Sequence, residues 1–129
     1  MNLNELLKDQ IRIEEKKLRA QLHYRDIQSC AAMKCLEFVI GRVNNGEPSL
    51  PEETIISLYK IKLSRLFISG KFTRYDVNTH KPVGEEKVDF ELLKELGYNF
   101  NESKAHEFIE EEKKSMMSQS SSECSSPSQ

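Results

Sequence analysis

Apolar residues in the first third of the chain recur at spacings typical of one long amphipathic helix. Residues 3–45 contain no proline, and their only glycine, Gly41, comes near the end. Apolar positions three, four, seven or eleven apart stack on one face of a helix with 3.6 residues per turn. These positions are Leu3, Leu7, Ile11, Leu18, Leu22, Met33, Leu36, Ile40 and Val43. We therefore predict a helix over residues 1–45, capped at its start by Asn2 or Asn4.

The apolar pattern is interrupted between Leu22 and Met33. Residues 25–26 and 28–29 are polar, while Ile27 and Cys30 are offset from the apolar face. A continuous helix of about 43 residues would be roughly 64 Å long, whereas a compact domain of this size is roughly 35 Å across. Either the helix bends in this interval and folds back, or it continues and its first half projects with an exposed apolar face.

A second helix, antiparallel to the first, is predicted over residues 49–69. The turn-forming segment 44–48 ends the first helix. Ser49 and Glu52 have the spacing of a capping box, Pro51 suits the first turn, and Gly70 suits a left-handed C-terminal position. The apolar face of this helix is formed by Ile56, Tyr59, Leu63, Leu66 and Phe67.

The remaining chain predicts smaller elements. Residues 71–88 begin with strand-forming residue types and contain a turn at 78–82, which favours either a small β-hairpin or an ordered loop. Asp89 and Asn101 are suited to cap two short helices within residues 89–114. Residues 115–129 are rich in serine and are predicted to be a disordered tail. The fold class is therefore mainly α, with a single domain over residues 1–114.

The composition of the chain excludes several classes of protein. The chain has 129 residues, of which 37% are hydrophobic, so it allows one domain with a small core. Its net charge of −2 argues against a generally basic nucleic-acid binder. No apolar run approaches the ~20 residues of a membrane span, and no secretory signal opens the chain. We expect a protein of the cytoplasm, or of the nucleus or the interior of a host cell, that is not secreted and has no membrane partner.

The sequence contains no catalytic constellation. Cys30, Cys35 and Cys124 lack a metal-binding spacing and are best interpreted as reduced thiols. His106 and Glu107 resemble the start of a helical zinc motif, but Glu110 occupies the position of its second histidine. We therefore predict no enzymatic activity, no metal and no cofactor.

Five basic residues form a candidate strip on and after the second helix. No acidic residue interrupts the segment, and aromatic residues are interleaved with the charges. Such a strip suits phosphates or an acidic protein surface, although it could also be solvated or pair with the acidic C-terminal helix of the same chain. The five residues are Lys60, Lys62, Arg65, Lys71 and Arg74.

These patterns favour an interaction protein. If the first helix projects, Leu7, Ile11, Leu18 and Leu22 form an exposed apolar face that requires a partner. We predict a small adaptor or regulator that docks through this helix on a larger complex, for example a polymerase or other nucleic-acid machinery, or self-associates as a coiled-coil homodimer. The alternative is a nucleic-acid-binding module that uses the basic strip.

Overall fold

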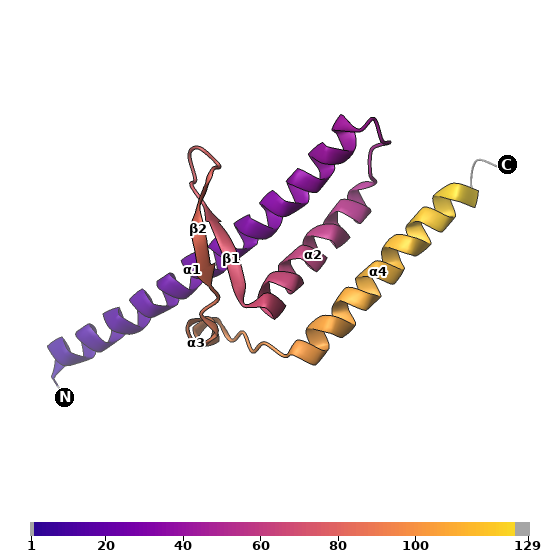
Figure 1. The fold of residues 1–129 in the computed structure, drawn as a ribbon. Coiled ribbons are helices and arrows are strands. Elements are labelled where there is room, and N and C mark those ends of the chain that lie inside the picture. Colours follow the sequence, from indigo (N-terminus) through magenta and orange to yellow (C-terminus); the bar gives the residue numbers. More distant parts are fainter. Residues whose placement is uncertain (1, 126–129) are drawn as a thin grey trace.

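The longest element of the molecule is one continuous N-terminal helix. The computed structural model describes residues 2–125, with side-chain surroundings for residues 2–117. Helix α1 spans Leu3–Asn44, and the Oδ1 atom of Asn2 caps it by accepting from the Glu5 N–H at 2.9 Å. The N-terminal half of α1 extends well past the other elements (Figure 1). Of the two alternatives, the continuous projecting helix is therefore correct, and no bend interrupts residues 22–33.

Helix α2, Glu52–Ser69, runs antiparallel along the second half of α1 (Figure 1). Its N-cap is Pro51, whose carbonyl accepts from the N–H groups of Thr54 and Ile55. The predicted capping box of Ser49 and Glu52 is therefore wrong: the chain is still extended at Pro51 (ψ 151°), so the helix starts later than predicted. Gly70 ends α2 with φ +73°, a conformation that costs glycine little.

The segment after α2 is a β-hairpin, as one of the two alternatives predicted. Strands β1 (Lys71–Tyr75) and β2 (Pro82–Lys87) pair antiparallel, with Phe72 opposite Glu86. Phe72 is buried against α1, which supplies the packing that an isolated hairpin lacks. In the connecting loop, a carboxylate oxygen of Asp76 accepts from the N–H groups of Asn78 and Thr79.

Two further helices and a 3₁₀ turn complete the domain. Helix α3 (Phe90–Leu93) is capped by Asp89 and continues into the 3₁₀ turn η1 (Lys94–Leu96). Helix α4 (Glu102–Ser125) is capped by Asn101, and it lies along α2 on the side away from α1 (Figure 1). Helix α4 continues past the boundary predicted at residue 114, because neither glycine nor proline interrupts it. Residues 126–129 of the predicted tail lie outside the described residues.

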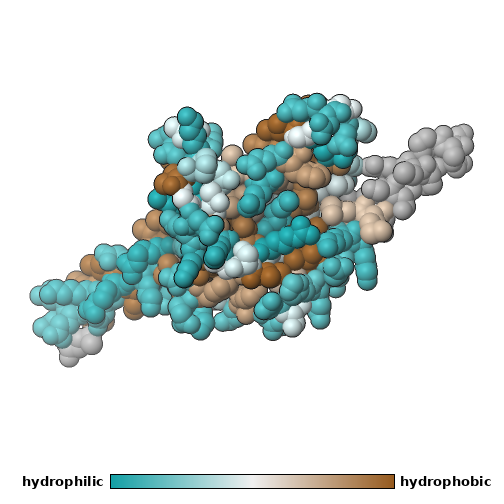
Figure 2. Space-filling view, viewed as in Figure 1, coloured by the Kyte–Doolittle hydropathy of each residue, from teal (hydrophilic) through white to brown (hydrophobic). Residues whose placement is uncertain are grey.

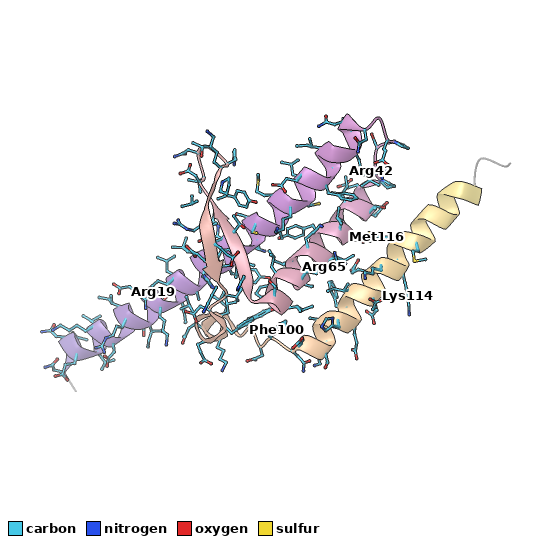
Figure 3. All side chains as sticks on the ribbon, in the orientation of Figure 1. Arg19, Arg42, Arg65, Phe100, Lys114 and Met116 are labelled. Atoms are coloured by element: carbon cyan, nitrogen blue, oxygen red, sulfur yellow. The ribbon has the colours of Figure 1, made fainter. Side chains whose placement is uncertain are left out.

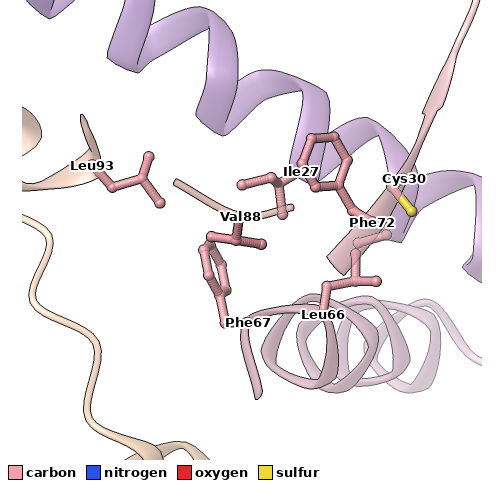
Figure 4. Close-up of a cluster of buried hydrophobic side chains, with 8 residues drawn as sticks. Ile27, Cys30, Leu66, Phe67, Phe72, Val88 and Leu93 are labelled. Atoms are coloured by element: carbon pink, nitrogen blue, oxygen red, sulfur yellow. The ribbon is translucent and has the colours of Figure 1, made fainter. Parts of the chain in front are cut away.

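The core lies where the middle of α1 meets α2, the hairpin and α3 (Figure 4). The Phe67 ring lies 4.9 Å from that of Tyr98 and 6.0 Å from that of Tyr24, measured between centroids. The interval of α1 in which the apolar pattern is interrupted is the part that packs here, through small side chains that allow close approach. The buried members of this cluster are Ile27, Cys30, Ala31, Leu66, Phe67, Phe72, Val88 and Leu93.

Candidate docking surface

The face of α1 opposite the core carries the four leucine and isoleucine side chains predicted as a docking site. Leu7, Ile11, Leu18 and Leu22, here called the apolar stripe, are between 49% and 56% exposed. At 100° per residue, they lie about 160–220° around the helix axis from Ile27, which is fully buried. Because the stripe points away from the core, no rotation of its side chains can bring it into the core.

The same face remains apolar in the second half of α1. Leu36, Ile40 and Val43 are 48% to 63% exposed and lie about 160–220° from Ile27 as well. Arg25 and Ser29, both exposed, separate the two apolar sections. Hydrophobic side chains lie between hydrophilic ones on the projecting part of α1 (Figure 2).

Polar contacts to the rest of the domain begin partway along α1. Among the described residues, Lys16 is the first of α1 to contact another element through a polar group, with its Nζ 3.1 Å from Glu95. About two turns further on, His23 accepts a hydrogen bond from the backbone of Asp89. Among the described residues, the turns of α1 before Lys16 therefore have no polar contact to another element. Fully burying an exposed leucine or isoleucine side chain contributes about 1.5–3 kcal/mol. A partner that covers the half-exposed side chains of the stripe would therefore gain part of this free energy at each of them.

The basic residues do not form one free strip. Lys60 lies 3.9 Å from Glu112 of α4, while Lys71 and Arg74 lie 3.8 Å and 2.8 Å from Glu85 and Glu86 of β2. Three of the five predicted positions are thus paired with acidic residues of the same chain.

The other two basic residues differ in their surroundings. The Nζ atom of Lys62 lies 6.0 Å from the centre of the Phe38 ring of α1. Arg65 is exposed and forms no ion pair with the described residues (Figure 3). A phosphate-binding strip would need these charges on one open face, and the structure distributes them over α2 and β1 toward different neighbours.

An apolar groove of about 580 Å³ lies between α1, α2 and α4. Arg42 and Met116 flank it from α1 and α4 (Figure 3). The Arg42 guanidinium also holds the loop before α2, since Nη2 donates to the Pro48 carbonyl at 3.0 Å and Nη1 lies 3.4 Å from Glu47. Sequence reasoning missed this groove because its lining comes from three separate segments. The lining residues are Phe38, Arg42, Leu50, Thr54, Leu58, Lys113, Met116 and Met117.

A second apolar hollow, of about 370 Å³, lies between α1 and α2 and adjoins the exposed face of α1. Ala32 and Leu36 belong both to this hollow and to that face. The Cys35 thiol at its edge donates to the Ile55 carbonyl at 3.7 Å, and burial raises the pKa of this thiol, so it is protonated at neutral pH. The lining residues are Ala32, Cys35, Leu36, Val39, Ile55 and Tyr59.

Metal-ligating side chains are scattered in the described part of the chain. No three histidine, cysteine, aspartate or glutamate side chains there lie close enough together to hold a metal ion. His106 instead lies 3.6 Å from Glu102, one turn earlier on α4. Within residues 2–125, no helix combines the length and the apolar content needed to cross a bilayer.

Known proteins do not supply a function for this chain. Comparisons with protein families, with characterised proteins and with solved structures give no match.

Proposed function

We propose that this protein is a small non-enzymatic adaptor or regulator that docks on a protein partner through the apolar stripe of α1. The observation that carries the proposal is the position of the stripe, which is exposed and lies opposite the core-facing side of the same helix. A helix with two opposite apolar faces can pack on its own domain and on another protein at once.

The charges beside the stripe favour a protein partner. Acidic and basic residues alternate along the polar sides of the projecting half, with Asp9 2.7 Å from Arg12 and Glu14 3.9 Å from Lys17. A helix that lies on an anionic membrane carries an excess of basic residues on its polar face. The mixed charges here are typical of helices that pair with other helices.

A single charge in the stripe tests the proposal. Leu18→Glu places a carboxylate in the docking face, and Val77→Glu adds the same charge in the hairpin loop, where the side chain is 83% exposed. We expect wild type and Val77→Glu to form a larger species in light scattering, alone or with a partner captured from the source cell. Leu18→Glu should lose this species while its circular dichroism and its thermal unfolding stay unchanged.

Two results would contradict the docking role. One is a monomeric wild type that captures no protein. The other is a Leu18→Glu variant that retains the same association as Val77→Glu.

A further inference from the structure

Two residues of opposite charge border the exposed face of α1, at similar distances from its central leucines Leu18 and Leu22. Glu14 lies four residues before Leu18, and Arg25 lies three residues after Leu22. At 100° per residue, both lie about 140–160° from Ile27 and therefore along one edge of the docking face. Arg25 is exposed and forms no ion pair with the described residues, while Glu14 is exposed beside Lys17 and Gln10.

The geometry points to a second copy of this chain as the occupant of the docking face, with the two α1 helices antiparallel. In this pairing Leu18 meets Leu22 of the second copy, and Glu14 meets its Arg25. The two-fold symmetry repeats each contact, so the interface contains two leucine contacts and two ion pairs at its centre. The inference rests on the proposed docking function and adds the occupant and its direction.

The charges select this arrangement over the alternatives. A parallel pairing in register would place Glu14 against Glu14 and Arg25 against Arg25, which costs free energy through like-charge repulsion. Shifting the antiparallel helices by one turn in either direction would place Arg25 opposite Ile11 or Leu18 and leave both charges without partners. The symmetric register alone pairs opposite charges and apolar side chains together.

The surface at the ends of this interface also fits a second helix. In the symmetric register, Ile11 of one copy lies over the small Ser29 of the other, and Leu7 lies over Ala32. Ala32 borders the 370 Å³ hollow that α1 forms with α2, where Tyr59 and Ile55 add apolar surface. The projecting half of each copy therefore packs beside α2 of the other, which accounts for an α1 much longer than its own domain.

Charge exchange tests the direction and the register. Sedimentation equilibrium of the full chain should show a dimer for wild type. Glu14→Arg and Arg25→Glu should each raise the dimer dissociation constant by about tenfold or more, because each creates two like-charge contacts. The double variant and an equimolar mixture of the two single variants should each return to within about threefold of wild type, since opposite charges meet again.

Matched controls use residues of the same charge further around the helix axis. Glu37→Arg and Arg19→Glu make the same charge changes at exposed positions about 90° from the centre of the face, and we expect dissociation constants within about threefold of wild type. Circular dichroism checks that all variants keep their helix content. Equal weakening by these controls would overturn the specific pairing.

The other outcomes separate this inference from the docking proposal. A dimer that is insensitive to Glu14→Arg and Arg25→Glu overturns the antiparallel register and leaves the stripe as the docking face. A wild type that stays monomeric overturns the second copy as occupant. If that monomer still captures a protein in the Val77→Glu form and not in the Leu18→Glu form, the docking function stands; if it captures none, both fail.

Discussion

The imidazole of His23 accepts a hydrogen bond at Nε2 from the backbone N–H of Asp89, 2.8 Å away and 66 positions later in the chain. The same ring meets the edge of Phe72, with 5.6 Å between the ring centroids. One residue of α1 therefore holds the hairpin and the start of α3 at the place where the helix begins to project.

Replacement of this side chain should weaken the domain. We expect His23→Ala to lower the free energy of unfolding by about 1–3 kcal/mol, because the Asp89 N–H loses its acceptor and Phe72 loses a ring contact. Urea unfolding followed by circular dichroism measures the change. Gln21→Ala, at an exposed position of the same helix, should change stability by less than about 0.5 kcal/mol, and an equal midpoint for both variants would contradict the role of His23.

Phe67 should be among the most sensitive positions of the core. It is buried and its ring contacts those of Tyr24, Phe90, Tyr98 and Phe100. Phe67→Ala should cost about 3–5 kcal/mol through lost burial and the cavity left behind. Thermal unfolding measures this loss against Val77→Ala, a loop position that is 83% exposed and should tolerate the change. A cooperative transition at the wild-type temperature for Phe67→Ala would show that the aromatic cluster does not hold the fold.

The hairpin loop should respond to acid through Asp76. Hydrogen bonds from the N–H groups of Thr79 and Asn78 lower the pKa of this carboxyl from its ordinary value of 3.8. A group with a lowered folded-state pKa stabilises the loop above the ordinary pKa, and the contribution is lost as the pH falls through the lowered value. The NMR signals of the Asn78 and Thr79 amides should therefore follow a titration whose midpoint lies below 3.8. Asp76→Asn should abolish this titration, whereas a midpoint above 3.8 would contradict the bonded carboxylate.

Nucleic-acid binding, the alternative function, should be weak. Lys60, Lys71 and Arg74 already pair with carboxylates of the chain, so few charges remain to displace counterions from a phosphate backbone. We expect Lys62→Glu combined with Arg65→Glu to leave retention on a duplex DNA column nearly unchanged. A steep salt dependence in wild type that becomes flatter in this variant would instead support the basic strip.

Local signals in the sequence identified most element boundaries because the responsible contacts are short in range. Asn2, Asp89 and Asn101 cap the helices to which they were assigned, and Gly70 ends α2 as expected. The capping box at Ser49 was wrong because the backbone around Pro51, and not the side-chain spacing, decides where α2 begins.

The core-facing side of α1 was not visible in the apolar pattern. Ala20, Cys30 and Ala31 are fully buried, yet small residues add little to a hydrophobic stripe. Residues 22–33, where the pattern of large apolar residues is interrupted, are therefore the region where α1 packs on the rest of the domain. The large residues that dominated the pattern lie on the opposite, exposed side.

By itself, the sequence determined the mainly helical class, most helix boundaries and the residues able to form an apolar face, since these depend on spacing and on caps a few residues away. Only the tertiary structure decided which face of α1 the domain covers. That choice depends on which side chains allow α2, the hairpin and α3 to approach the helix closely, and such complementarity between distant segments leaves no periodic signal along the chain.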